Sequence, residues 1–361
     1  MDGALTDRAP ADRANDKGIL SAVWHAAKDI RIERRVRPAL EPGEVRLRVT
    51  RCGICGSDMH EFLNGPHAIP VKEPHPISGV VAPLVLGHEF TGEVVEINGA
   101  CGAVKVGQRV AVEPEYRCGA CAACLQGDYN LCEKMGFAGL MGHGGMAEEA
   151  VVPHYMLHIL PDAVTDRQAA VLESAAVALH ALRRSGLTAG QSVAVVGAGP
   201  IGLLLVQLSA VAGAKRIVVS DVSDARLARA RALGATETVN SLSGHLPTQA
   251  RGVDVAFEAV GVQPALDDAI QSVRKGGKDV LVGLFGAPAR VDAFDLVNRE
   301  VEIIPSCGYR HVYADLIGMI AGGLFDPSLI VTREVPLAEV VASAFERLGA
   351  PNDDVKVLVV P

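Results

Sequence analysis

The stretch VAVVGAGPIG, residues 193–202, decides the fold class of this chain. Four apolar residues are followed by glycines at positions 197, 199 and 202. In such a pattern the first glycine permits a tight turn, the second lets the backbone approach a pyrophosphate, and the third allows a helix to pack closely on the strand. The stretch therefore predicts a buried strand, a glycine-rich turn and a helix that together bind a dinucleotide.

The next apolar run, RIVVSD, ends in Asp221, twenty-four residues after Gly197. A carboxylate there can accept hydrogen bonds from both hydroxyls of the adenosine ribose, and it repels a 2′-phosphate. Neither Val222 nor Ser223 supplies the positive charge that a phosphate needs, so we expect NAD rather than NADP. The alternative is a plain glycine turn followed by a solvated strand-end aspartate. The predicted cofactor-binding residues are Gly197, Gly199, Pro200, Ile201, Gly202, Asp221 and Arg226.

One hydrophobic pattern extends on both sides of this motif, from residue 166 to residue 305. Continuous apolar runs alternate with helical stretches, which is the pattern of a parallel sheet with crossover helices. The expected strands are SVAVVG, RIVVSD, VDVAFEAVG and KDVLVGLFG, and two of the expected helices are DARLARARALGA and PALDDAIQSVRKGG. We therefore predict an α/β protein with a doubly wound, Rossmann-type domain over 166–305.

The rest of the chain has a different hydrophobic pattern, in which apolar and polar residues alternate. In GEVRLRVTRCG, residues 43–53, apolar Val45, Leu47 and Val49 alternate with arginines, the period of a half-buried strand. Similar runs at 91–97 and 109–114 favour an antiparallel barrel or sandwich. A helix around LAEVVASAFERLG and a strand VKVLVV are expected near the C-terminus. We predict that residues 19–165 and 306–361 form one catalytic domain, with the dinucleotide-binding domain inserted between them.

Composition and charge bound the class of protein. A length of 361 residues suggests two domains, and a net charge of −8 offers no basic surface to a nucleic acid. Residues 1–18 lack an apolar run, so we expect a disordered extension rather than a secretory signal. The uncharged stretch between Arg184 and Lys215 raises a membrane span as an alternative, which its glycines and proline disfavour. We expect a cytoplasmic protein with reduced thiols.

A cluster of four cysteines is the strongest indication of a metal site in this sequence. CGACAACLQGDYNLC, residues 118–132, holds four of the eight cysteines, at Cys118, Cys121, Cys124 and Cys132. Four thiolates complete a tetrahedral zinc shell and leave no open position for a substrate. We therefore predict a structural zinc that braces a loop poor in apolar residues. The alternatives are a chance cluster, a disulfide pair, or a nucleic-acid zinc ribbon, and the acidic flanks disfavour the last.

A second set of potential ligands is dispersed. RCGICGSDMH, residues 51–60, contains two cysteines, a serine, an aspartate and a histidine, and PLVLGHEFTGEV places His88 and Glu89 after an apolar run. Spacing alone does not join these segments, because each is common on surfaces or in cores.

Jointly, these motifs carry a resemblance. CGICGSDMH, GHEFTGEVVEI, the four-cysteine spacing and VAVVGAGPIG occur in the order and approximate spacing of the zinc-dependent medium-chain alcohol and polyol dehydrogenases, over nearly everything after residue 19. LNGPHAIPVKEPHPISG, GGMAEEAVVP and DLVNREVEIIPS with GYRH resemble the (R,R)-butanediol dehydrogenase branch, with sorbitol dehydrogenases close by. The resemblance implies a GroES-like, mainly-β catalytic domain built from both chain ends, beside the Rossmann domain.

The resemblance also implies roles for matched positions. Cys55 and His88 match zinc ligands, and Glu89 matches a carboxylate that binds or approaches the metal. Glu173 matches the glutamate of a family Glu-Pro pair, but Ser174 replaces the proline, so the local backbone and Glu173's ligation are open. The remaining implied roles are Ser57 bonding the reacting oxygen, His60 passing the proton outward, Asp58 orienting a histidine, and Tyr309 and Arg310 lining the cleft, whereas Cys52 is expected to serve packing.

These implications give an expected function. A mixed Cys, His and Glu shell leaves one position open, where zinc acts as a Lewis acid on an alcohol whose hydride passes to NAD. The resemblance favours oxidation of (R,R)-butane-2,3-diol to acetoin, reversibly, by a homodimer or homotetramer. Sorbitol, another polyol or threonine is the alternative substrate. A nucleotide-binding protein without activity, like zinc-free relatives of the fold, is disfavoured because Cys55, His88 and Glu89 are all present.

Overall fold

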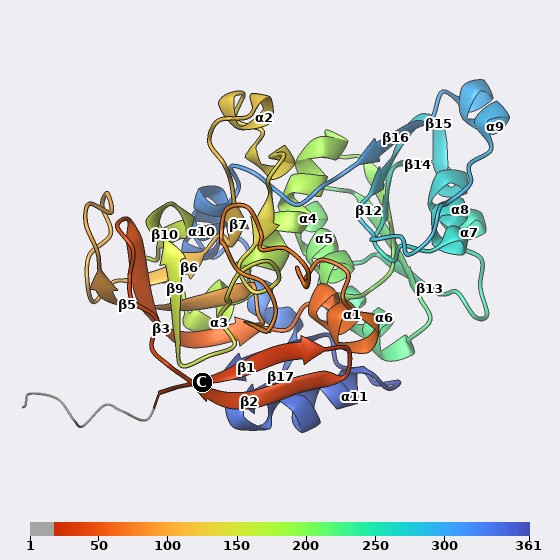
Figure 1. The fold of residues 1–361 in the computed structure, drawn as a ribbon. Helices are drawn as coiled ribbons and strands as arrows, with labels where there is room; N and C mark the ends of the chain where they lie inside the picture. The colour runs from red at the N-terminus through yellow and green to blue at the C-terminus, as the bar shows by residue number, and fades with distance from the viewer. Residues whose placement is uncertain (1–17) are drawn as a thin grey trace, which may run out of the picture.

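The computed structural model describes residues 18–361 and divides them into two halves of different architecture (Figure 1). Except for Gly18, the extension predicted for residues 1–18 lies outside the described residues. One half is built on a six-stranded parallel sheet and the other on mostly antiparallel strands. The fold class predicted from the sequence is therefore confirmed.

The parallel sheet has the strand order β13-β12-β11-β14-β15-β16. The chain starts in the middle of the sheet with β11, moves outward to one edge, then returns and moves to the other, which is the doubly wound order. The point where the direction reverses lies between β11 and β14. The six strands of this sheet are β11 (Ser192–Val196), β12 (Arg216–Asp221), β13 (Glu237–Asn240), β14 (Val253–Glu258), β15 (Val273–Leu281) and β16 (Glu302–Pro305).

Helices cover both faces of this sheet because the central strands are apolar on both sides. In β11, Val193 and Val195 join the larger core with α4 and α5, whereas Ala194 and Val196 face the smaller core under α7 and α8. The helices of this half are α4 (Leu172–Ser185), α5 (Pro200–Val211), α6 (Asp224–Ala232), α7 (Leu246–Gln249), α8 (Gln263–Ser272) and α9 (Ala293–Arg299).

The mainly-β half joins the two ends of the chain. Its larger sheet has the order β10-β6-β5-β3-β18-β17, with β9 also on β3, and a smaller sheet has the order β2-β1-β4. Strand β18 pairs antiparallel with β3 through Leu358 and Val359. The strands are β1 (Ile19–Ala26), β2 (Asp29–Arg35), β3 (Glu44–Gly53), β4 (Leu84–Val85), β5 (Glu89–Ile97), β6 (Arg109–Val112), β9 (Glu149–Pro153), β10 (Leu157–Ile159), β17 (Val331–Pro336) and β18 (Lys356–Val360), with β7 (Glu115–Tyr116) and β8 (Gly136–Phe137) forming a separate pair.

The short helices of this half connect strands or project from them. In Figure 1, α2 stands away from both sheets. These helices are α1 (Gly56–Asn64), α2 (Ala122–Leu125), α3 (Asp166–Ala169), α10 (Tyr313–Ala321) and α11 (Glu346–Leu348).

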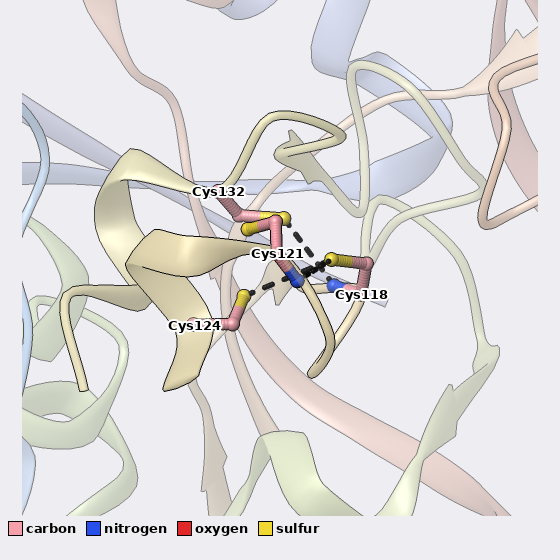
Figure 2. Close-up of side chains that lie close together, drawn as sticks. All are labelled: Cys118, Cys121, Cys124 and Cys132. Atoms are coloured by element: carbon pink, nitrogen blue, oxygen red, sulfur yellow. Dashed lines mark hydrogen bonds between the residues drawn. The ribbon is translucent and has the colours of Figure 1, made fainter. Parts of the chain in front are cut away.

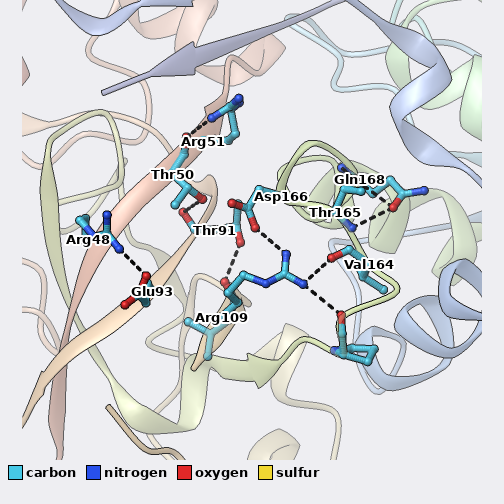
Figure 3. Close-up of polar contacts among 12 residues, drawn as sticks. Arg48, Thr50, Arg51, Thr91, Glu93, Arg109, Val164, Thr165, Asp166 and Gln168 are labelled. Atoms are coloured by element: carbon cyan, nitrogen blue, oxygen red, sulfur yellow. Dashed lines mark hydrogen bonds and ion pairs between the residues drawn. The ribbon is translucent and has the colours of Figure 1, made fainter. Parts of the chain in front are cut away.

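Ion pairs link neighbouring strands and tie β6 to the segment that follows the first part of the mainly-β half (Figure 3). Arg48 on β3 faces Glu93 on β5, the residue opposite it in the register. Arg109 on β6 donates to Asp166 at 2.9 Å and to the carbonyls of Pro161 and Val164 at 3.1 and 2.7 Å. A single guanidinium thus ties a strand of the mainly-β half to the segment that leads into α3.

Some local predictions were wrong. The helix expected over PALDDAIQSVRKGG stops at Ser272, and Val273 already begins β15. Arg46, expected on the open face of its strand, is 3% exposed because its guanidinium donates to Glu96 and to the Pro38 carbonyl. Among residues 18–361, no helix is long and apolar enough to cross a membrane.

Candidate functional site

The glycine-rich turn leaves β11 and enters α5. Gly197 has φ of +98°, a left-handed backbone conformation that favours glycine. A Cβ on Gly202 would lie 1.8 Å from the Gly197 carbonyl oxygen, so this glycine is required for the helix to lie against the turn. A Cβ on Gly199 would meet nothing within 4 Å. The space beside Gly199 is therefore open to a ligand.

Asp221 ends β12 directly beside this turn. Its Oδ2 accepts the backbone N–H of Ala198 at 2.7 Å, and its Oδ1 accepts that of Ser223 at 2.9 Å. Each carboxylate oxygen keeps a free lone pair for a hydroxyl donor. Arg226 lies on α6, and its guanidinium reaches the Asp354 carbonyl at 3.5 Å. Pro200 and Ile201 are half-buried in the first turn of α5.

The four clustered cysteines converge on one point (Figure 2). Their sulfur atoms all lie within 4.8 Å of one another, and Cys118 Sγ is 3.9 Å from Cys124 Sγ. Zinc–sulfur bonds of about 2.3 Å in a tetrahedron place sulfurs about 3.8 Å apart. The donor set therefore fits zinc.

The pKa values of two of these cysteines are shifted in opposite directions. The N–H groups of Ala120 and Cys121 lower the pKa of Cys118 to about 6. Desolvation, with the neighbouring thiols, raises the pKa of Cys124 to about 12. Four thiolates thus require a divalent cation to be deprotonated together. All four ligand positions belong to the protein, so this centre offers no place to a substrate.

A second cluster joins the two dispersed segments. The ligand atoms of Cys55, His88 and Glu89 lie within 4.8 Å of one another. Cys55 precedes the first residue of α1, His88 precedes β5, and Glu89 is its first residue. His88 is 3% exposed and Glu89 is fully buried, whereas Cys55 is half-buried. One soft and two harder donors leave a position open to a small molecule, which is the composition of a catalytic zinc site.

Helix α1 supplies the groups around this cluster. Asp58 Oδ2 accepts the Cys55 N–H at 2.9 Å, and its Oδ1 lies 3.5 Å from His88 Nδ1. Ser57 Oγ lies 3.4 Å from His88 Nε2. His60 is exposed one helical turn after Ser57. The helix thus brings a hydroxyl to the cluster and a histidine to solvent.

Glu89 takes part in a buried ion pair that the sequence did not predict. Lys356 Nζ donates to both carboxylate oxygens of Glu89 at 2.7 Å, and Ser174 Oγ donates to Oε1 at 2.7 Å. Burial would raise the pKa of Glu89, but the Lys356 ammonium and His88 hold it below its usual value. Lys356 comes from VKVLVV, where the apolar neighbours gave the only signal that its side chain is buried.

Glu173 lies near this cluster but outside the 4.8 Å group. It sits in the first turn of α4 and is 6% exposed. Burial raises the pKa of Glu173 to about 7, opposed by His88. Tyr309 is fully buried beside it, and burial together with Glu173 raises the Tyr309 pKa well above its usual value.

Arg310, expected to line the substrate cleft, is bonded to another part of the molecule. Its guanidinium instead bonds Asn130 at 3.0 Å and pairs with Asp128 at 3.1 Å, both in the loop of the four cysteines. Cys52 is fully buried in the core of the mainly-β half, which confirms its packing role.

Two family models match this chain. An alcohol dehydrogenase GroES-like domain matches residues 41–162, and a zinc-binding dehydrogenase domain matches residues 200–322. An (R,R)-butanediol dehydrogenase of Bacillus subtilis is 41% identical over 347 residues, covering 94% of this chain and 99% of that protein. A sorbitol dehydrogenase of the same organism is 34% identical, covering 94% and 97%.

Solved structures are similar over nearly the whole chain. The crystal structure of 2R,3R-butanediol dehydrogenase from Bacillus subtilis has a TM-score of 0.90 and 40% identity, covering 95% of this chain and all of that one. A putative zinc-binding dehydrogenase from Sinorhizobium meliloti bound to NADP and an alcohol dehydrogenase from Escherichia coli complexed with NADH each have a TM-score of 0.86. Their identities are 29% and 28%, and each comparison covers 95% of this chain and 99% of the other.

Proposed function

The chain belongs to the zinc-dependent medium-chain alcohol and polyol dehydrogenases, and from this premise we propose that it transfers hydride between NAD and a secondary alcohol of a vicinal diol. The proposed substrate pair is (R,R)-butane-2,3-diol and acetoin. The observation that carries the proposal is the open cluster of Cys55, His88 and Glu89 in a chain 41% identical to a butanediol dehydrogenase.

Two zinc ions per chain are proposed, one for each cluster. The four cysteines would hold a structural ion, and Cys55, His88 and a glutamate would hold the catalytic one. When bound, the catalytic zinc supplies Lewis acidity that favours loss of the alcohol proton, and NAD accepts the hydride.

The protein's own groups handle the proton and the geometry. Ser57 Oγ, near His88, is the proposed relay: it accepts a hydrogen bond from the reacting hydroxyl and, as it takes that proton, donates its own onward. His60 lies one turn further along α1, on the same side of the helix and in solvent, and is the proposed proton exit. Asp58 holds the Cys55 backbone and faces His88, so it fixes the orientation of the imidazole.

NAD is proposed over NADP on account of Asp221. Its carboxylate faces the turn that would hold the pyrophosphate, and it is kept in place by two backbone N–H groups. A 2′-phosphate would meet this negative charge without a cation from Val222 or Ser223. Similar structures carry NADP in one case and NADH in another, so the residue rather than the family supports this choice.

The test is a panel of alcohols. The zinc-loaded protein is assayed for reduction of NAD and NADP with the butane-2,3-diol stereoisomers, sorbitol and threonine, with and without a chelator. We expect the highest kcat/KM with NAD and the (R,R) diol, and loss of turnover with chelator. Higher kcat/KM with sorbitol would favour the second candidate, which the 34% identical sorbitol dehydrogenase supports.

A homodimer or homotetramer is also proposed. On α9 and in the segment that precedes it, four apolar side chains are 46% to 80% exposed: Leu284, Val291, Phe294 and Val297. A second copy is the proposed cover. Phe294→Asp is expected to lower the mass in sedimentation, and Leu242→Asp, which alters an equally exposed residue elsewhere, should not.

Cytoplasmic location and domain limits complete the proposal. All eight cysteines are free thiols, as two cysteine-based metal sites require and as a reducing compartment maintains. The proposed substrate is a small molecule, and the net charge of −8 disfavours nucleic acid. The pairing of β18 with β3 supports a domain built from both ends of the chain. The proposed limits are 19–165 with 306–361 and 166–305, with α3 at the boundary packed on β3 and β5.

A further inference from the structure

A cavity of about 230 Å³ lies in the mainly-β half, and none of the clustered metal ligands lines it. It is bounded by the start of β1, the end of β2, β9 and the segment around His143. Much of its wall is apolar, from Ile19, Val36, Val80, Val85 and Val151. Polar side chains line the remainder, and two of them hold donors that lack an acceptor.

Arg35, the last residue of β2, brings an unpaired positive charge to this cavity. Arg37, two residues further on, pairs with Glu149 at 2.7 Å. The guanidinium of Arg35 instead faces the ring of His143, with Nη1 3.0 Å from Nδ1 and Nη2 3.1 Å from Nε2. No carboxylate of residues 18–361 lies within ion-pair distance of it. Burial lowers the pKa of Arg35, but a guanidinium keeps its charge in proteins, so this half-buried cation has no counter-ion.

His143 cannot act as that counter-ion. Its Nδ1 accepts the backbone N–H of Val85 at 3.2 Å. Burial and the charge of Arg35 lower the pKa of His143 to about 4, so the ring is neutral at pH 7. Because Nδ1 accepts, the single ring proton lies on Nε2. The Nε2–H and the Nη2–H of Arg35 are then two donors side by side, and the missing partner is an acceptor.

The charges around the cavity limit what that acceptor is. Glu149 also lines it, with its carboxylate already bonded by Arg37 at 2.7 and 3.0 Å. Glu44 lines it as well and accepts only the Glu41 N–H, at 2.8 Å. These two acids repel a doubly charged anion, whereas one negative charge balances Arg35. A carboxylate carries that charge on two oxygens that match the guanidinium fork, and the apolar wall suits a short aliphatic chain.

We propose that this cavity binds a small aliphatic monocarboxylate, with its oxygens on the Arg35 guanidinium and the His143 Nε2–H and its chain against the apolar wall. The site shares no residue with the proposed reaction centre. The inference therefore goes beyond the proposed function and does not depend on it.

The test is calorimetric titration of the full-length, zinc-loaded protein with four probes: isobutyrate, acetate, isobutanol and inorganic phosphate. We expect isobutyrate to bind, and acetate to bind about tenfold more weakly because it buries two carbons fewer. Isobutanol, which has no charge, and phosphate, which carries too much, should not bind measurably. No binding of isobutyrate, or tighter binding of phosphate, would overturn the inference.

Variants locate the bound carboxylate. Arg35→Gln should weaken isobutyrate binding at least about tenfold, because a charged, two-pronged hydrogen bond is lost. His143→Phe keeps a ring but removes the N–H, and should also weaken binding. Arg31→Gln is the matched control, since Arg31 lies on the same strand but is bonded to Asp29 at 2.8 and 2.6 Å. Wild-type affinity in Arg35→Gln would contradict the site.

Two other locations for the carboxylate are separated by further variants. A metal at the open cluster also attracts carboxylates, so the titration is repeated with Cys55→Ser, in which isobutyrate should bind as in wild type. Binding lost in Cys55→Ser but kept in Arg35→Gln would place the ligand at that cluster and overturn the inference. The aspartates of residues 1–17 are a second source of carboxylate: Asp2, Asp7, Asp12 and Asp16. Replacing all four by asparagine should leave the affinity unchanged, and tighter binding would show that the chain itself competes for Arg35.

Discussion

Asp279 is a carboxylate buried where no partner reaches it. It lies on β15 at 0% exposure, and neither of its oxygens has a hydrogen-bond partner among residues 18–361. Burial, with the charge of Glu258, raises the pKa of Asp279 well above its usual value. The folded protein therefore keeps a proton that the unfolded chain releases, and folding is penalised at neutral pH.

We predict that Asp279→Val raises stability by about 1–3 kcal/mol at pH 7. The unfolded carboxyl ionises above about pH 4, whereas the raised pKa of Asp279 makes the folded one hold its proton to a higher pH. Wild-type stability therefore falls as pH rises from there, and the gain should grow between pH 4 and pH 7. Thermal unfolding at both pH values measures it, with Asp279→Asn as the polar, non-titrating control. A lower Tm for Asp279→Val at pH 7 would refute this.

At single residues, the sequence predicted the members of the open cluster but not all of the contacts that they make. The matched motifs named Cys55, His88 and Glu89, which the fold brings together. No local pattern could indicate that Lys356 would pair with Glu89, 267 positions away, because that contact depends on β18 pairing with β3. Arg310 shows the opposite error: proximity in sequence to Tyr309 did not bring it to the cleft.

At the scale of elements, the three glycines of the nucleotide turn are not equivalent. Gly202 packs against the Gly197 carbonyl, whereas Gly199 faces open space. One glycine therefore serves the fold and another serves the ligand.

Two substitutions separate these roles. Gly202→Ala places a Cβ 1.8 Å from a backbone oxygen, so we expect a lower Tm by differential scanning calorimetry. Gly199→Ala should keep the wild-type Tm but bind NAD at least tenfold more weakly, or about 1.4 kcal/mol, because its methyl fills the space for a pyrophosphate. Equal Tm values for the two variants would contradict this division, and calorimetric titration with NAD gives the second readout.

The loop of the four cysteines is held to the rest of the molecule mainly by polar contacts. Tyr129 bonds Glu113 at 2.7 Å, and Asn130 bonds the Cys307 carbonyl at 2.7 Å. Helix α2 has no buried residue. With so little apolar packing in α2, we expect the loop to depend on the proposed structural zinc.

Cys121→Ser is accordingly predicted to lower the zinc content from two ions to one per chain and to lower the Tm, while the remaining zinc still supports turnover. Cys307→Ser, which changes a cysteine outside both clusters, is the control and should retain two. Metal analysis and thermal unfolding measure both effects. Unchanged zinc content and Tm in Cys121→Ser would remove the structural assignment.

At the scale of the whole molecule, the hydrophobic pattern of the sequence predicted the parallel sheet and the mainly-β half. Apolar runs buried on both faces indicated the parallel sheet, and alternating runs indicated the mainly-β half. The irregular helical segment after Leu337 was less predictable. It begins as a 3₁₀ turn and passes through a π-type stretch at Val341–Phe345, because packing against the core sets its pitch.

Two clusters of potential metal ligands lie in one half of the chain, and the central question is which of them performs the reaction. The cluster of four cysteines is complete and has no open position. The cluster of Cys55, His88 and Glu89 is incomplete and adjoins Ser57. The proposed chemistry therefore belongs to the second cluster.

The most direct test is NADH formation from NAD and (R,R)-butane-2,3-diol by Cys55→Ser, measured with its zinc content, Tm and NAD affinity. We predict that turnover is abolished and zinc falls from two ions to one per chain, while the protein stays folded and still binds NAD. Wild-type turnover in Cys55→Ser would contradict it.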